Sequence, residues 1–344
     1  MRHNVAQGVH SFFITDDNFA RNKDWEPILD RLIALREGEG IRLRCTIQAD
    51  TLCHRIPRFI EKAGRAGVVR VFIGLESINP ESLLGAKKKQ NRITEYQQML
   101  LAWKGIGAVI WAGYIIGFPA DTPESVMRDI GIIQRELPID FLEFFLLTPL
   151  PGSEDHQKLA LAGVDMDADL NRYDTFHAVT AHARMSRETW EATYWAAWKI
   201  YYTLEHMEVL RRRAAATGIS LGKMLTMLLS FWGLSLLEHT HPLEGGYLRY
   251  KVRTERRPGF EIEPIWRFWP AYAGDVLWKH ARMAGMAARL LRLRHRLKRD
   301  PEARRYRDLA LTPVEETSTL ELLSGAGAAT PAAGKRAQLL PVGP

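Results

Sequence analysis

Polar side chains follow four short apolar runs in the first half of this sequence. A carboxylate at such a position can pair with an ammonium group in a partly desolvated site, and hydroxyl or amide groups can add hydrogen bonds. If the fold brings the ends of these runs together, the polar residues form a binding site for a charged small molecule. These residues are Asp16, Asp17, Gln48, Glu76, Ser77 and Thr148.

The elements that must position these residues are short strands that alternate with amphipathic helices. Such alternation implies parallel strands joined by right-handed crossovers, as in a doubly wound sheet or a β/α barrel. Barrel enzymes collect their functional residues at the C-terminal ends of several strands, so we favour an open or incomplete α/β barrel. The predicted strands are residues 11–15, 41–48, 69–74, 108–117 and 141–147.

Helical spacing of apolar residues predicts helices between the strands. Three consecutive residues predict where one helix starts. Thr122 can cap free backbone N–H groups, Pro123 suits the first turn, and Glu124 favours the positive end of the helix dipole. Beyond residue 152 we predict helices over 186–217 and 219–240 and a basic helix from about 275 to 297. The aromatic row between Trp190 and Tyr201 is interpreted as helix-packing core.

Four segments resemble, in the same order, barrel strands of radical-SAM proteins, especially those with an N-terminal cobalamin-binding domain. Residues 12–19 (FFITDDNF) are similar to the second strand, and residues 72–81 (FIGLESINPE) to the fourth. Residues 113–125 (GYIIGFPADTPES) are similar to the fifth strand, and residues 148–152 (TPLPG) to the close of the sixth. The likeness covers about residues 8–155 and extends weakly to 241–246.

The resemblance implies a fold and a domain division. We expect a partial (β/α)6 radical-SAM-type barrel with strands 2 to 6 over residues 1–155, and a mainly helical domain over residues 156–310. Residues 311–344 become rich in Ala, Gly and Pro from position 323 onward, which predicts a disordered tail.

The resemblance also implies a reaction and its cofactors. In that family a [4Fe–4S] cluster cleaves S-adenosylmethionine (SAM), and the 5′-deoxyadenosyl radical abstracts a hydrogen atom from the substrate. Some members also use cobalamin, which points to a methyltransferase-type reaction. Three thiolates of a C-x3-C-x2-C loop hold the cluster, and the fourth iron stays open to SAM.

The sequence departs from this pattern at the cysteine loop. It contains two cysteines, Cys45 and Cys53, which we interpret as small buried or loop residues rather than ligands. The family's cysteine loop precedes the second strand, which here begins about ten residues from Met1. We therefore expect residues 1–10 to form the end of the first helix and the cluster ligands to lie upstream. This chain alone is expected to be inactive.

The resemblance assigns SAM contacts to the polar strand ends. Asp16 and Asp17 match positions that contact the SAM amino group, although they or Asn18 could instead cap the next helix. Gln48 is expected to face the same cavity.

The later strands supply the remaining expected contacts. Glu76 and Ser77 match positions that hydrogen-bond the ribose or carboxylate of SAM, with a helix cap by Ser77 as the alternative. Gly117 and Phe118 are expected to lie against adenine, since glycine permits close backbone approach, or else to form a tight turn. Thr148 is a weaker case of the same kind.

The composition of the chain limits the classes of partner that we expect. The net charge is +7, but the basic residues between 289 and 307 do not alternate with aromatic residues as a stacking platform would need, Tyr306 being the one aromatic residue of Phe, Trp or Tyr type among them, so nucleic acid is not expected. Two cysteines and no signal-peptide pattern indicate a cytoplasmic location. The apolar run 219–237 carries Lys223 and is short for a membrane span of roughly 20 residues. It predicts a buried or interfacial helix, so peripheral membrane association stays open.

Two functional hypotheses follow. The first is a radical-SAM enzyme that acts on a small-molecule or lipid-like substrate, with the missing N-terminal portion supplied separately. The second is a non-catalytic SAM- or partner-binding module from a truncated or split barrel. The second strand would then expose an apolar edge at Phe12, Phe13 and Ile14, which disfavours a freestanding module. A doubly wound nucleotide-binding enzyme is disfavoured because no G-x-G-x-x-G follows a strand.

Overall fold

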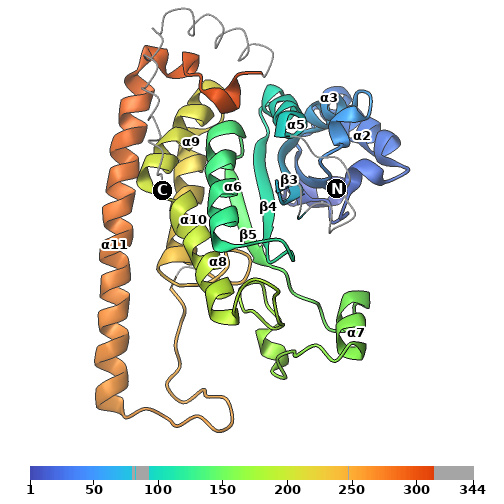
Figure 1. The fold of residues 1–344 in the computed structure, drawn as a ribbon. Helices are drawn as coiled ribbons and strands as arrows, with labels where there is room; N and C mark the ends of the chain where they lie inside the picture. The colour runs from blue at the N-terminus through green and yellow to red at the C-terminus, as the bar shows by residue number, and fades with distance from the viewer. Residues whose placement is uncertain (80–81, 83–92, 247, 314–344) are drawn as a thin grey trace, which may run out of the picture.

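Five parallel strands form one sheet, and their order in space is their order in the chain. A computed structural model describes residues 1–79, 82, 93–246 and 248–313 (Figure 1). All five predicted strands are confirmed, with small shifts of their ends. They are β1 (Ser11–Phe13), β2 (Arg44–Ala49), β3 (Val68–Glu76), β4 (Val109–Ile116) and β5 (Phe141–Leu146).

The strand order decides between the two predicted architectures. In a doubly wound sheet the spatial order of the strands reverses at a switch point, and the connecting helices change from one face of the sheet to the other. The order β1-β2-β3-β4-β5 contains no reversal, so successive crossovers cover the same face and the sheet curls into a half-barrel. The predicted partial barrel is confirmed.

Helices on the outer face hold the sheet through apolar side chains. Phe59 and Trp103, from neighbouring helices, meet edge to face with ring centroids 6.2 Å apart. The predicted helix start at Thr122 is confirmed, because its hydroxyl accepts the Ser125 N–H at 3.2 Å and Ser125 Oγ accepts the Thr122 N–H at 2.9 Å. These helices are α2 (Trp25–Ile33), α3 (Phe59–Ala66), α5 (Ile93–Gly105) and α6 (Pro123–Glu136).

The strands alternate between a buried outer face and a partly open inner face. On β3, Val71, Ile73 and Leu75 are buried beneath the helices. Phe72 and Glu76, between and beyond them, are partly exposed on the inner face. This period of two separates the core from the face that can receive a ligand.

The C-terminal half is helical and closes the β5 edge of the sheet from both sides. On the outer face, Trp198 contacts Phe144 at a centroid distance of 5.2 Å. On the inner face, Phe231 contacts Phe141 at 5.0 Å. Figure 1 shows this bundle beside β5. The bundle consists of α8 (Arg187–Tyr201), α9 (Leu204–Ala216), α10 (Leu221–Leu236) and α11 (Ile265–Arg299), and α7 (Glu154–Leu161) lies apart from it in Figure 1.

The aromatic row of α8 is core, as predicted. Trp190, Tyr194, Trp198 and Tyr201 are each at most 1% exposed. The apolar run 219–237 forms α10, which buries Met224 and other residues against its neighbours, so the buried-helix prediction is confirmed. Among the described helices, none combines the length and apolar character that a bilayer span requires.

Two helix predictions need correction. The segment 186–217 is two helices, because Tyr202 leaves the helical conformation and Thr203 caps α9 by accepting the His206 N–H at 3.2 Å. The basic helix begins at Ile265 rather than near 275. Pro270 lies inside it, and a proline in a helix removes one backbone hydrogen bond without always ending the helix.

The remaining described elements are short. Residues 2–6 are helical as predicted, forming α1 (Arg2–Ala6). Residues 80–81, which belong to the segment that resembles the fourth strand, and residues 314–344 of the predicted tail lie outside the described residues. The short 3-10 and π segments are Phe19–Arg21, Ala34–Gly38, Cys53–Arg55, Leu170–Arg172, Pro301–Arg305 and Leu309–Leu311.

Candidate functional site

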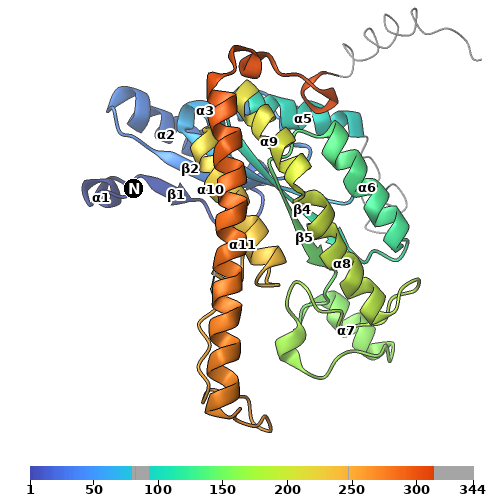
Figure 2. The ribbon, with the colours of Figure 1, turned by 90° about the vertical axis from the view of Figure 1, so that its left-hand side faces the viewer.

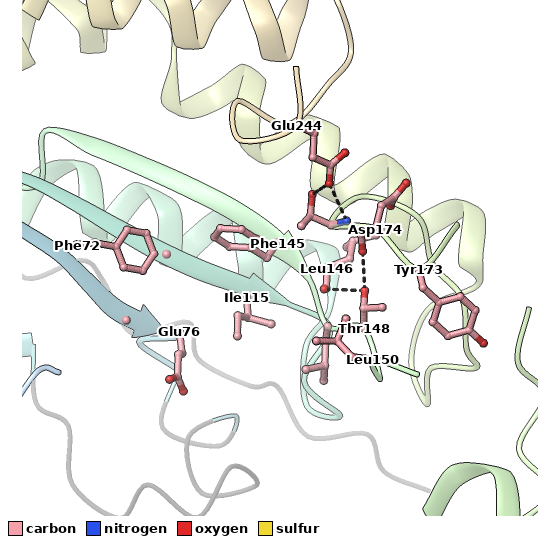
Figure 3. A pocket seen from close by; sticks show the side chains of 14 residues that line it. Phe72, Glu76, Ile115, Phe145, Leu146, Thr148, Leu150, Tyr173, Asp174 and Glu244 are labelled. Atoms are coloured by element: carbon pink, nitrogen blue, oxygen red, sulfur yellow. Dashed lines mark hydrogen bonds between the residues drawn. The ribbon is translucent and has the colours of Figure 1, made fainter. Parts of the chain in front are cut away.

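A cavity of about 550 Å³ lies on the inner face, at the C-terminal ends of β3, β4 and β5 (Figure 3). The C-terminal ends of parallel strands are where β/α barrels bind their ligands. Two of the predicted residues, Glu76 and Thr148, line the cavity. The full lining is Phe72, Gly74, Glu76, Gly113, Ile115, Phe145, Leu146, Leu147, Thr148, Leu150, Tyr173, Asp174, Thr175 and Glu244.

Glu76 enters the cavity because the end of β3 is irregular. The register between β3 and β4 shifts between Gly74 and Glu76, and Glu76 has a left-handed backbone with φ of +63°. A bulge of this kind changes the direction in which a side chain points. The left-handed backbone conformation is strained for a residue other than glycine. Figure 3 shows the Glu76 carboxylate beyond the end of the strand, where it can accept hydrogen bonds or pair with a cation.

Thr148 shapes the opposite wall. Its hydroxyl lies 3.1 Å from the carbonyl oxygens of both Leu146 and Asp174 and donates to this pair of acceptors. The connection after α7 is thereby held against the end of β5. Thr148 therefore holds the wall in place, and its hydroxyl donates to main-chain carbonyl groups.

The wall also contains residues that sequence reasoning did not identify. Glu244 Oε1 accepts a hydrogen bond from Thr175 Oγ1 at 2.9 Å, which joins the α10–α11 connection to the segment that follows α7. The only sequence signal was the weak likeness over 241–246. Asp174, which also lines the cavity, carries no motif.

A histidine–carboxylate pair stands at this wall. Asp174 Oδ2 lies 2.6 Å from His177 Nδ1, and Asp174 Oδ1 accepts the backbone N–H groups of Phe176 and His177. The carboxylate thus fixes the ring and favours a proton on Nδ1.

The floor of the cavity is narrow because two rings cover a glycine. A Cβ on Gly113 would lie 3.0 Å from Phe72 and 3.2 Å from Phe145, so only glycine fits beneath these rings. Flat apolar faces of this kind suit an aromatic base or another planar ligand. Figure 3 shows both rings on the sheet beside Ile115.

Glu143 lies in the same row, directly opposite Gly113 in the ladder. Its side chain is fully buried, and neither carboxyl oxygen has a hydrogen-bond partner among the described residues. Burial raises the pKa of Glu143 to about 7. The sheet beneath the cavity therefore holds a carboxyl group that carries a proton in mildly acidic solution.

The residues predicted at the first two strands lie outside the cavity lining. Asp16 Oδ1 accepts the Asn18 N–H at 3.0 Å, and Asp16 Oδ2 accepts from the Asn22 side chain at 2.6 Å. These bonds form an Asx turn ahead of the 3-10 segment Phe19–Arg21, and Asn18, the N-cap of that segment, makes no side-chain cap bond, so the helix cap that the sequence offered as the alternative is not formed there. Asp17 is exposed, and Gln48 points to the inner face in register with Phe72.

Ser77 is fully buried and forms a turn. Its hydroxyl accepts the Asn79 N–H at 3.1 Å, whereas the helix after Pro80 that the sequence expected Ser77 or Asn79 to cap falls largely outside the described residues. The cavity lining does not include it.

Gly117 and Phe118 form the turn that ends β4. Both backbone N–H groups donate to Asp121 Oδ2, at 2.9 and 3.0 Å. A Cβ on Gly117 would lie 1.9 Å from the ring of Trp190, so this glycine, with φ of +119°, is needed for packing. The turn geometry therefore explains both residues without a ligand.

The two cysteines do not fit an iron–sulfur cluster. Cys45 and Cys53 are fully buried, and burial raises the pKa of Cys45 to about 11 and that of Cys53 to about 12. Two buried thiols also fall short of the three thiolates that such a cluster requires. In the described ranges, no group of three or more His, Cys, Asp or Glu side chains could hold a metal ion.

The chain has relatives among curated proteins. It is 30% identical over 167 residues to the bacteriochlorophyllide d C-12(1)-methyltransferase of Chlorobaculum tepidum, covering 48% of this chain and 35% of that protein. It is 25% identical over 145 residues to the hopanoid C-2 methylase of Rhodopseudomonas palustris, covering 41% of this chain and 28% of that protein. No family model matches.

Solved structures show the same kind of likeness. The radical S-adenosylmethionine methyltransferase TsrM from Kitasatospora setae matches with 21% identity and a TM-score of 0.37, over 42% of this chain and 29% of that protein. The cobalamin-dependent S-adenosylmethionine radical enzyme OxsB, with aqua-cobalamin bound, matches with 12% identity and a TM-score of 0.39, over 94% of this chain and 50% of that protein.

The curated relatives are methyltransferases by name. The predicted resemblance is confirmed, since the similar solved structures are radical S-adenosylmethionine enzymes, TsrM with cobalamin and a [4Fe–4S] cluster and OxsB with aqua-cobalamin. The chain spans about a third of the length of the curated relatives it matches. The cysteines that bind a cluster are not among its own residues.

Proposed function

We propose that this chain forms the substrate- and SAM-facing part of a radical-SAM methyltransferase that acts on a small-molecule or lipid-like acceptor. The observation that carries the proposal is the strained, re-aimed Glu76 in a cavity of about 550 Å³ at the strand ends. The methyltransferase relatives support the reaction class.

Each side of the cavity matches one part of SAM. Glu76 offers a carboxylate that accepts hydrogen bonds from the ribose hydroxyls, and the rings of Phe72 and Phe145 offer a flat apolar face to adenine. Gly113 lacks a side chain, which allows these two rings to lie close over the floor of the cavity. The roles assigned to Asp16, Asp17, Gln48, Ser77, Gly117, Phe118 and Thr148 remain proposals of the resemblance.

The cluster is proposed to belong to another segment. A [4Fe–4S] cluster would supply the electron that cleaves SAM, but Cys45 and Cys53 cannot hold it. β1 pairs with β2 on one side, and within the described residues its other side carries no strand. We therefore propose that a cluster-bearing segment, from the same polypeptide or a separate chain, pairs with β1, and that this chain alone is inactive.

The remaining proposals concern organisation and location. We propose a boundary near residue 155 between the barrel and the helical domain, a cytoplasmic location, and peripheral contact with a membrane. A second candidate function is a non-catalytic SAM- or partner-binding module, which the absence of cluster ligands from this sequence favours.

Calorimetric titration of the chain with SAM tests the proposal. We expect binding that Glu76→Gln weakens by about tenfold or more, because the variant loses a charged hydrogen-bond acceptor. Glu205→Gln, at an exposed carboxylate on α9, is the matched control and should bind as the wild type does. Equal affinity of both variants, or no binding, would reject this cavity as the SAM site.

A second assay separates enzyme from binding module. The chain is mixed with a separately produced polypeptide that carries a reconstituted C-x3-C-x2-C cluster, and formation of 5′-deoxyadenosine from SAM is followed. Product that depends on both components supports the enzyme. SAM binding without product from any such mixture supports the binding module.

A further inference from the structure

The first half of α11 presents an apolar stripe to solvent. Trp266, Trp269 and Leu277 are 77%, 51% and 71% exposed. With Ala273 they follow a spacing of three, four and four residues, which places them on one helix face. Tryptophan is usually highly buried, so two exposed tryptophans on one stripe are unusual for a soluble surface.

The opposite face of α11 fixes the rotation of the helix. Phe268, Met286 and Leu290 are buried on that face. Lys279 is also buried there, and its Nζ donates to Glu238 at 3.0 Å and to Asp275 at 2.8 Å. The stripe therefore cannot turn inward without breaking these contacts.

The segment before α11 extends the same surface. Tyr250, Phe260 and Ile262 are 82%, 68% and 52% exposed. Figures 1 and 2 show this segment and the start of α11 together at one end of the molecule, projecting away from the helical bundle. A cluster of exposed large apolar side chains at a projecting end marks an interaction surface.

The charge around this surface is positive. Residues 249–282 contain eight Lys and Arg and four Asp and Glu, a net charge of +4. Arg267 and Arg282 are both exposed, and the Arg282 guanidinium lies 6.0 Å from the ring centroid of Trp278, which is 52% exposed. Long basic side chains beside tryptophan suit the interface of an anionic bilayer, where the rings enter the headgroup layer and the cations meet phosphate.

We propose that this tip surface (Phe260, Ile262, Trp266, Trp269, Leu277 and Trp278, with Arg267 and Arg282) docks on an anionic membrane. A second copy of this chain is a poorer occupant, because it would bring like charge to like charge. The inference deepens the proposed membrane contact and does not depend on the proposed methyl transfer.

Sedimentation of the full chain with lipid vesicles tests the proposal without SAM or turnover. We expect binding to vesicles of phosphatidylcholine and phosphatidylglycerol in a ratio of about 3:1, and little binding to pure phosphatidylcholine. High salt should weaken the binding. Tryptophan emission should shift to shorter wavelength as the exposed rings leave water.

Variants assign the binding to the tip surface. Trp266→Ser/Trp269→Ser/Leu277→Ser should reduce partitioning by about tenfold or more, and Arg267→Glu/Arg282→Glu should also weaken it. Leu161→Ser is the matched control, because this side chain is 90% exposed and lies on α7, which Figure 1 shows apart from α11, and it should bind as the wild type does. Thermal unfolding should be similar in all variants, since every replaced side chain is exposed.

Three results would overturn the proposal. They are no vesicle binding, binding that the triple variant retains, and equal binding to neutral vesicles at all salt concentrations. A wild type that is dimeric in solution and becomes monomeric in the triple variant would assign the surface to a second copy instead. None of these results bears on SAM binding in the cavity, which is measured separately.

Discussion

Glu143 on β5 lies directly opposite Gly113 on β4, so a fully buried carboxyl group borders the glycine that forms the cavity floor. Neither carboxyl oxygen of Glu143 has a hydrogen-bond partner among the described residues. Burial without partners disfavours the charged form, which is why the pKa of Glu143 rises to about 7. The protonation of Glu143 therefore makes the free energy of unfolding depend on pH.

Glu143 should make the wild type less stable as pH rises. The carboxyl group of the unfolded chain has a pKa near 4.5, so between this value and about 7 the folded state holds a proton that the unfolded state has lost. The contribution of Glu143 to the free energy of unfolding should fall over that range by up to about 3 kcal/mol, against an opposite contribution from His206 and His241, whose pKa values burial lowers to about 3 and about 4. In Glu143→Gln this fall should be absent, as urea unfolding at several pH values between 5 and 8 would show.

The exposed variant Glu205→Gln controls for the change of side chain and should keep the wild-type pH dependence. If Glu143→Gln and wild type lost stability in parallel from pH 5 to pH 8, Glu143 would not be the buried proton-holding group.

Gly117 should tolerate no side chain. Gly117→Ala would place Cβ 1.9 Å from the Trp190 ring and force φ of +119° on alanine. Because Trp190 also donates from Nε1 to the Ile116 carbonyl at 2.9 Å, its ring cannot move away freely. We expect a loss of about 3 kcal/mol or more in the free energy of unfolding.

Gly152→Ala is the matched control for this substitution. Gly152 also has a positive φ, of +87°, but nothing lies within 4 Å of its added Cβ. It should lose only about 1 kcal/mol, the cost of the backbone conformation. Equal losses in thermal or urea unfolding would show that backbone strain, not the Trp190 contact, determines the effect.

Lys104 and Asp140 form a buried ion pair that should be costly to break. Their side chains are 3% and 2% exposed, and Asp140 Oδ2 also accepts the Ile110 N–H at 2.8 Å. Lys104→Met would leave the carboxylate without its cation and should cost about 3–5 kcal/mol. Lys104→Met/Asp140→Leu should recover part of this loss in urea unfolding, and a double variant no better than the single one would contradict the pairing.

The strands and outer helices were predictable because their signals are local. The strand runs, the Thr122 cap and the spacing of apolar residues each depend on neighbours in the sequence, and the structure confirms them. Strand alternation also placed Glu76 and Phe72 on one face. The choice between a barrel and a doubly wound sheet did not follow from local signals, because only the spatial order of the strands distinguishes the two folds.

The site was predictable only in part. Glu76 and Thr148 line the cavity as strand-end residues, but Glu244 and Asp174 come from long connections whose paths depend on packing. The need for glycine at position 117 arises from Trp190, a residue far along the chain. Local patterns could not distinguish a ligand-binding turn from a packed one.

Glu76 should show opposed effects on stability and on binding. Its left-handed backbone, with φ of +63°, is strained for any residue with a Cβ, and Arg58 at the start of α3 has the same φ. Glycine relieves such strain, so Arg58→Gly and Glu76→Gly should each keep or raise the free energy of unfolding, by up to about 1 kcal/mol. Only Glu76→Gly should weaken SAM binding in calorimetry, because only it removes a carboxylate from the cavity. A Glu76→Gly protein that binds SAM as tightly as Arg58→Gly would mean that the strain at Glu76 serves the turn alone.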